Sequence, residues 1–251
     1  MKETQIEWAK NPDGTQGYTW NPITGCLNGC SYCYARRLAN TRLRERYMAN
    51  KNWDTKTPDG YEGYPNLDPF YPRFWPERLE PGRKMPRNAG VFVCDMSDLF
   101  GIGVPYHWTK AVIDFILLRP DCRFYLLTKQ PQNLLKFSPF PDNCWVGVSA
   151  TNSDMFETAF RTLMRITARV KYVSFEPLLD WTRTEGLINP IKHLDWLIIG
   201  AQTKPYKPPQ IEWVEEIKLA ADKAGIPVFM KDNLKTLFQG KNLTLRQAMP
   251  K

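Results

Sequence analysis

Short apolar runs separated by amphipathic stretches make up most of the chain from residue 91 onward. The runs are rich in β-branched and aromatic residues and do not alternate with polar ones, which is typical of strands covered on both faces. Their starts lie 21 to 33 residues apart, enough for the crossover helix that joins parallel strands. The runs are Val91–Cys94, Phe124–Thr128, Trp145–Ser149, Tyr172–Glu176, Trp196–Gly200 and Val228–Met230.

Helical spacing of apolar residues is found between these runs, at Tyr106–Leu118, Asp154–Ile166 and Ile211–Ala224. Nearer the N-terminus we expect an extended segment at Tyr18–Thr24 and a helix from Tyr34 to about Met48. The alternation of strands and helices along the chain predicts an α/β fold, a partial (β/α)6-type TIM-like barrel. No linker divides the chain, so residues 1–251 are predicted to form a single domain.

One stretch, from about residue 50 to residue 90, breaks this rhythm. It is rich in proline, glycine and aromatic residues and has no clean period. We interpret it as a functional insertion or lid.

The charge and the hydropathy of the chain indicate which partners and which cellular compartment to expect. The formal net charge is +8, which favours polyanionic partners, although the 26 acidic residues are interspersed with the basic ones. The first ten residues lack the apolar run of a signal peptide, and no stretch approaches the length of a membrane span. A cytoplasmic protein without a membrane partner is therefore expected.

A loop at residues 24–35, TGCLNGCSYCYA, gathers three of the six cysteines. This crowding does not resemble a secreted disulfide framework and favours reduced thiols that bind a metal. A 4Fe-4S cluster normally takes four protein thiolates, so three local ones would leave one iron open. A structural zinc site is the alternative, but the two histidines, His107 and His193, are distant in sequence and there is no second CxxC.

The loop resembles the signature of the radical S-adenosylmethionine superfamily, CxxxCxxC with an aromatic residue before the last cysteine. Cys26, Cys30 and Cys33 match its metal ligands, and Tyr32 matches the aromatic position. The resemblance implies a 4Fe-4S cluster and S-adenosyl-L-methionine (SAM) as cofactors, an external electron donor, and a 5′-deoxyadenosyl radical that abstracts a substrate hydrogen.

Further segments are similar to the phage Gp37/Gp68-type family, whose substrate is poorly defined. They are WNPITGC, FWPERLEPGRKMPRNAGVFVCDMSDLF, LLTK, VGVS, FEPLL and the strand ending in IIG, and the LLTK region has some likeness to the spore photoproduct lyase group. This resemblance supports the cofactors and leaves the substrate open.

Polar residues follow the predicted strands, where a parallel barrel builds its active site. The cofactor-binding candidates are Tyr32, Ser97, Asp98, Lys129, Ser149 and Glu176. Lys129 would bind the methionine carboxylate of the cofactor, and Ser149 or Glu176 its ribose hydroxyls. The alternatives are turn residues, helix caps (Ser97, Thr151 and Ser153 among them), and an ion pair between Glu176 and Lys129.

Cys94, at the end of its predicted strand, is a candidate hydrogen donor to a radical, with simple packing as the alternative. Basic residues in the helix after the loop, and basic and aromatic residues in the insertion, suggest contact with nucleic acid. We therefore predict a radical SAM enzyme that modifies or repairs a nucleic acid base or nucleotide. The alternatives are a radical SAM enzyme acting on a small metabolite and a non-catalytic nucleic acid binding module with a structural metal site.

Overall fold

The chain folds as two compact units in the computed structural model, which describes residues 1–52, 67–80, 85–182, 187–239 and 245–250. The first unit comprises Met1–Thr4 and Ala9–Asn133, and the second comprises Gln5–Trp8 and Leu134–Lys251. In the described part of the chain, no helix is both long and apolar enough to cross a membrane.

The first unit is built on four neighbouring strands in the order β1-β2-β5-β6. The pairs β2–β5 and β5–β6 are parallel, whereas the short β1 joins β2 in antiparallel fashion. A separate antiparallel pair is formed by β3 and β4. The elements are β1 (Lys2–Glu3), β2 (Tyr18–Trp20), β3 (Ile23–Thr24), α1 (Tyr34–Asn40), α2 (Arg44–Ala49), β4 (Arg73–Phe74), the 3-10 helix Pro76–Arg78, β5 (Gly90–Val93), α3 (Tyr106–Leu117) and β6 (Arg123–Thr128).

Helix α3 closes one side of this unit through aromatic contacts. The ring of Phe115 lies 4.8 Å from that of Trp20 on β2, and the hydroxyl of Thr109 donates to the carbonyl of Leu99 at 2.7 Å. Such packed aromatic pairs add roughly 0.5–1.5 kcal/mol beyond the area that they bury. The apolar face of α3 therefore packs against the buried strand β2.

The helix predicted from Tyr34 to Met48 is instead two helices, and this prediction was wrong in its continuity. Thr41 ends α1 with non-helical backbone angles, and its hydroxyl donates to the carbonyl of Arg37 at 2.8 Å. The side-chain amide of Asn40 donates to the carbonyl of Arg36 in the same way. Polar side chains that compete for backbone carbonyls weaken a helix, and α2 starts only at Arg44.

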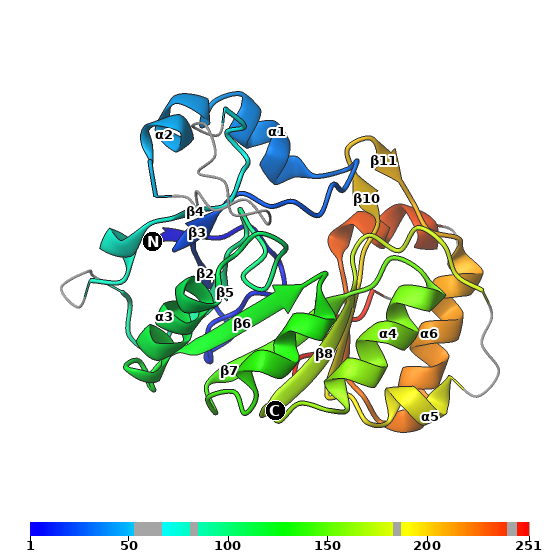
Figure 1. The fold of residues 1–251 in the computed structure, drawn as a ribbon. Helices are drawn as coiled ribbons and strands as arrows, with labels where there is room; N and C mark the ends of the chain where they lie inside the picture. The colour runs from blue at the N-terminus through cyan, green and yellow to red at the C-terminus, as the bar shows by residue number, and fades with distance from the viewer. Residues whose placement is uncertain (53–66, 81–84, 183–186, 240–244, 251) are drawn as a thin grey trace. The chain divides into compact units, whose positions relative to one another are not determined.

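The second unit contains a four-stranded parallel arrangement in the order β7-β8-β9-β12. Helix α4 packs against β7 and β8, and α5 lies against α6 (Figure 1). The elements are β7 (Cys144–Ser149), α4 (Ser153–Leu163), β8 (Val170–Phe175), α5 (Ile188–Ile191), β9 (Trp196–Ile199), β10 (Gln202–Thr203), β11 (Tyr206–Lys207), α6 (Ile211–Ala224), β12 (Val228–Met230) and the 3-10 helix Asp232–Phe238. A further 3-10 helix, Pro131–Phe137, connects the two units in sequence.

A layer of large rings fills the core of the second unit. Trp8, from the short N-terminal segment of this unit, has its ring 6.2 Å from Tyr172 and 6.0 Å from Trp196. Gly147 makes room for this layer, because a Cβ there would lie 2.3 Å from the Tyr172 ring. Strand β7 therefore needs glycine at this position.

The predicted fold class is confirmed, since parallel strands alternate with helices as expected for a partial barrel. All six predicted apolar runs are strands, and their ends differ from the prediction by no more than two residues. The single-domain assignment of residues 1–251 stays a prediction. Much of the predicted insertion or lid, including residues 53–66 and 81–84, lies outside the described residues.

Candidate functional site

The cysteine loop begins at the last residue of β3, Thr24, and is attached to two other parts of the first unit. The Gly25 N–H donates to the carbonyl of Met96, and the Cys26 N–H donates to that of Phe70. Gly25 has φ +88°, and a Cβ there would lie 2.2 Å from the carbonyl oxygen of Tyr71. Only glycine fits this close approach of two backbones.

The three thiols of the loop, Cys26, Cys30 and Cys33, are free and half-buried. The sulfur of Cys26 accepts the Asn28 N–H at 3.4 Å. The sulfur of Cys33 caps α1 by accepting the Arg36 N–H at 3.3 Å. Burial raises the pKa of the Cys26 thiol to about 12, so this side chain binds a metal only with loss of a proton.

The donor set fits an iron–sulfur cluster in its chemistry. Three soft ligands lie within eight residues, and N–H groups already point at two of the sulfurs, as they do toward cluster thiolates. Among the described residues, no three His, Cys, Asp or Glu side chains are arranged as a finished metal site. Gly29, with φ +71° and open space around it, lies between the first two cysteines. Binding would therefore require the sulfurs to move closer together.

Tyr32 and Lys129 lie together at this loop. The Lys129 ammonium is 5.9 Å from the centroid of the Tyr32 ring, within the range of a cation–π contact. The pKa of Tyr32 is raised by burial first and then by Cys30 and Cys33. The side chain of Lys129 thus extends from the end of β6 toward the cysteine loop.

Asp98 connects the loop to the end of β6. Its buried carboxylate accepts the side-chain amide of Asn28 at 2.9 Å, the Lys129 N–H at 2.9 Å and the Phe100 N–H at 3.1 Å. The Asn28 side chain in turn accepts a hydrogen bond from the Gln130 amide at 2.8 Å. One carboxylate oxygen of Asp98 therefore joins the loop to the end of β6, and the other holds the Asp98–Phe100 turn.

Ser97 also holds the loop in place. Its hydroxyl donates to the carbonyl of Gly25 at 2.5 Å, so it does not cap a helix. Neither Thr151 nor Ser153 is the N-cap of α4. Asn152 has that role and accepts the Met155 N–H at 2.9 Å.

A second carboxylate, Asp95, lies beside the loop with two partners that the sequence did not indicate. The amide of Asn21 donates to it at 2.5 Å, and the hydroxyl of Tyr34 lies 3.4 Å from its other oxygen. Burial raises the pKa of the Asp95 carboxyl, although both hydrogen bonds lower it. The strand-end position of Asp95 was a usable signal, whereas its partners lie 61 and 74 residues away in sequence.

Cys94 directly follows β5 and has a left-handed backbone, φ +64°, which is uncommon outside glycine. Its side chain is 3% exposed, and burial raises the pKa of its thiol. The Cys94 carbonyl accepts the Ser97 N–H, which forms the turn that carries Asp95. The thiol is packed in the core, and hydrogen donation by it stays a prediction.

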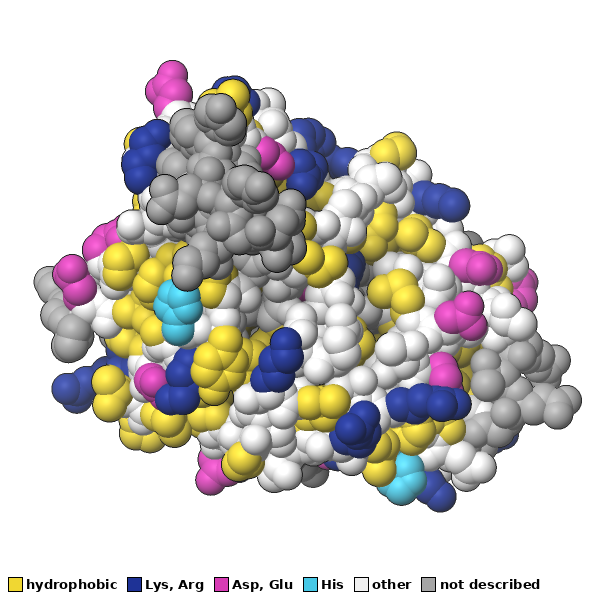
Figure 2. All heavy atoms as spheres, viewed as in Figure 1, with side chains coloured by type: hydrophobic (Ala, Val, Ile, Leu, Met, Phe, Trp, Pro, Cys, Tyr) yellow, Lys and Arg dark blue, Asp and Glu magenta, His cyan; other side chains and the backbone are white. Residues whose placement is uncertain are grey.

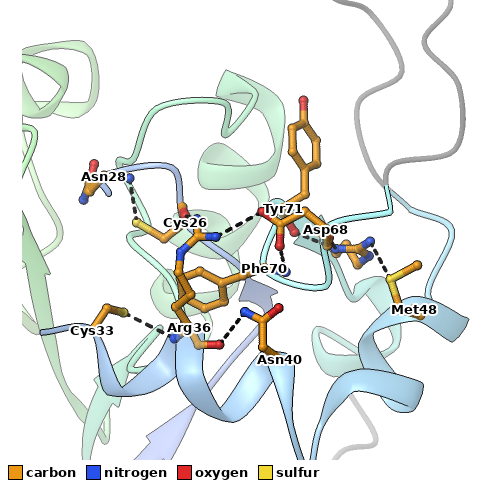
Figure 3. A network of polar contacts seen from close by, with 10 residues as sticks. Cys26, Asn28, Cys33, Arg36, Asn40, Met48, Asp68, Phe70 and Tyr71 are labelled. Atoms are coloured by element: carbon orange, nitrogen blue, oxygen red, sulfur yellow. Dashed lines mark hydrogen bonds and ion pairs between the residues drawn. The ribbon is translucent and has the colours of Figure 1, made fainter. Parts of the chain in front are cut away.

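Arg36 joins the loop to the described part of the insertion (Figure 3). Its guanidinium donates to the Cys26 carbonyl and to the Asp68 carboxylate, both at 3.2 Å, and lies over the ring of Phe70. Phe70 packs in a buried cluster with Trp75 and residues of α1 and α2. This part of the insertion therefore supports the cysteine loop.

Two candidates, Ser149 and Glu176, belong to the second unit, and each has partners within that unit. Ser149 ends β7 directly opposite Ser174 of β8. Glu176 finds its ionic partner within the same unit, in Lys231 after β12, and accepts the Trp8 indole N–H at 3.2 Å. Burial lowers the pKa of Lys231, but Glu176 and Glu7 raise it by more, so the net shift is upward.

Fold and site together define an α/β protein of parallel strands that carries a three-cysteine loop. The sequence matches over residues 3–240 a family described as "Protein of unknown function (DUF5131)". The chain belongs to the DUF5131 family. It matches none of the curated proteins.

Solved structures of spore photoproduct lyase are similar to this chain. One variant has 15% sequence identity and a TM-score of 0.48, covering 92% of this chain and 80% of the lyase. A second variant, with bound AdoMet and dinucleoside spore photoproduct, has 16% identity and a TM-score of 0.46 over 91% and 78% of the two chains. The lyase complexed with dinucleoside spore photoproduct has 15% identity and a TM-score of 0.46 over 83% and 75%.

Proposed function

We propose that this chain is a radical SAM enzyme whose cluster is bound by Cys26, Cys30 and Cys33. One observation carries the proposal. The loop has three free thiols and is hydrogen-bonded to other parts of the first unit, and N–H groups already point at two of its sulfurs. A zinc knuckle would add a fourth nitrogen or sulfur ligand, and His107 is fully outside the loop on α3. Three ligands instead leave one iron open for a second cofactor.

When bound, the cluster and SAM would supply a 5′-deoxyadenosyl radical for hydrogen abstraction. The electron needed to form this radical would come from an external donor. The residues of the chain hold and orient both cofactors. Lys129 would offer its ammonium to the carboxylate of SAM, beside the ring of the loop residue Tyr32. Ser97 and Asp98 would act on the cofactors indirectly, because their side chains hold the loop in place.

Ser149 and Glu176 remain our candidates for the ribose hydroxyls. Both follow strands of the second unit, and their acceptor oxygens suit hydroxyl donors. Cys94 remains a candidate hydrogen donor. The substrate that we propose is a nucleic acid base or nucleotide, which the enzyme modifies or repairs.

Anaerobic reconstitution with iron and sulfide tests the proposal. We expect the broad visible absorption of an iron–sulfur cluster, a change in it when SAM is added, and 5′-deoxyadenosine once a reductant is present. Cys30→Ala should lose the bound iron and the product. Cys144→Ala is the matched control, because this buried cysteine starts β7 in the other unit and should keep both.

Two results would contradict the proposal. The first is an equal yield of 5′-deoxyadenosine from wild type and Cys30→Ala. The second is tight, stoichiometric zinc without iron, which would favour a structural metal in a non-catalytic protein.

A further inference from the structure

Three arginines project from the segment that follows the cysteine loop, and we call Arg37, Arg42 and Arg44 the arginine face. All three are exposed. Between residues 34 and 50 the chain has five arginines and one acidic residue, Glu45. Figure 2 shows basic side chains gathered over α1 and α2. This part of the surface therefore carries a strong positive charge.

The arginine face has no acidic partner among the described residues, unlike three cations elsewhere on α3, α4 and α6. Lys110, Arg161 and Lys218 each pair with a carboxylate four residues away. In the described part of the chain, the side chains of the arginine face make no hydrogen bond and no ion pair, so their charge is not neutralised locally. An anionic partner can therefore form charge-assisted hydrogen bonds with these arginines.

The position of the arginine face relates it to the proposed active site. Cys33 is the N-cap of α1, and its carbonyl accepts the Arg37 N–H at 3.4 Å, so Arg37 lies one helical turn from a proposed cluster ligand. The field of these charges extends over about 10 Å at moderate salt and thus reaches the loop. A polyanion bound here is held beside the metal-binding cysteines.

Tyr34 adds an aromatic surface to the same helix. Its side chain is 44% exposed, and its hydroxyl donates to the Asp95 carbonyl at 2.7 Å, which fixes the ring. Tyr34 and Arg37 are three residues apart and therefore lie on the same side of α1. Arginines for phosphates next to a fixed ring for a base are the combination used to bind single-stranded nucleic acid.

We infer that the arginine face, with Tyr34, binds the sugar–phosphate backbone of a nucleic acid strand and brings a base toward the cysteine loop. The inference rests on the proposed function and deepens it, because it selects a polynucleotide over a nucleotide or a small metabolite. A single phosphate engages one or two arginines, whereas three separated arginines suit consecutive phosphates of a chain.

Fluorescence anisotropy of the full-length protein tests the inference, with a fluorescein-labelled 20-nucleotide strand as the probe. The test variant is Arg37→Gln, Arg42→Gln and Arg44→Gln together. The matched control is Lys110→Gln, Arg161→Gln and Lys218→Gln together, which removes the same charge from cations that are already paired. Affinity is measured from low to high salt for all three proteins.

Wild type should bind the strand with a steep salt dependence. In the test variant the slope of log K against log salt should fall by roughly 2 to 3, and the affinity at 0.1 M salt by about 100-fold, because each phosphate contact contributes about 0.7–0.9 to the slope. The control variant should keep the wild-type slope to within about one contact. Tyr34→Ala should weaken binding without changing the slope, because stacking releases no counterions.

Three results would overturn the inference. One is no binding of the strand by wild type even at low salt, and another is an equal loss in the test and control variants. The third is stronger binding to phosphatidylserine vesicles than to the strand.

Failure of the inference and failure of the proposed function are separable on one preparation of wild-type protein. SAM cleavage without strand binding refutes only the inference. Strand binding without SAM cleavage refutes only the proposed function.

Discussion

Replacing Asp98 by alanine distinguishes a residue that holds the loop from one that binds a cofactor. The substitution leaves the Asn28 amide and the N–H groups of Lys129 and Phe100 without their acceptor. A buried donor that loses its partner costs about 1–3 kcal/mol. The half-buried Asn28 can turn toward water, so we expect a total loss of about 3–5 kcal/mol, mostly from the two backbone groups.

In a chain of this size, 1 kcal/mol corresponds to roughly 2–4 °C in the midpoint of thermal unfolding. Asp98→Ala should therefore unfold about 10 °C below wild type when both are measured by circular dichroism without metal. Asp114→Ala is the control, since its exposed ion pair with Lys110 contributes no more than about 1 kcal/mol.

The same variant should take up less iron on reconstitution, because the loop has lost its attachment to β6. A midpoint within about 2 °C of wild type, which is less than the shift expected for 1 kcal/mol, would refute the positioning role. Normal stability together with lost SAM binding would instead make Asp98 a direct ligand of the cofactor.

Two further predictions concern charged groups in the two units. Glu176→Gln removes the carboxylate from Lys231, whose side chain is only 13% exposed, and should destabilise the protein by about 3 kcal/mol in urea unfolding. Adding Lys231→Met should recover much of that loss, and additive effects of the two substitutions would contradict the buried pair. Asp95 has a folded-state pKa above its unfolded value, so ionised Asp95 costs stability as pH rises from 3 toward 7. The stability of Asp95→Asn relative to wild type should therefore increase over that range. Urea unfolding at pH 3 and pH 7 measures this difference, and a decrease with pH would contradict the raised pKa.

The strands were predictable because each is a continuous apolar run, and burial on both faces is a local property of such a run. The residues at which the strands begin and end were less predictable. Strand β8 starts at Val170, two residues before the predicted Tyr172, because pairing with Trp145 of β7 extends it. The break at Thr41 depended on one hydroxyl competing for a carbonyl, which residue spacing does not reveal.

The candidate site was predictable to the level of residue type and strand end. The cysteine loop and the polar residues after β5 and β6 could be named because their spacing is local. Their partners could not. Asp98 meets Asn28 across 70 residues, and Glu176 meets Lys231 across 55, so no window of sequence contains both members of either pair. The sequence therefore indicated charged groups at the strand ends without separating those that hold the loop from those that are free to bind.

The attachments of the cysteine loop also bear on how the protein is made. The loop leaves the ribosome before the groups that fix it, which are Phe70, Met96, Asp98 and Gln130. The last of these is synthesised about 100 residues after Cys33, or roughly 5–20 s later at ordinary translation rates. During that interval the three thiols are reactive and unsupported. Under the proposed function, cluster insertion is therefore expected late in biogenesis, and a truncated chain ending before β6 should not retain iron.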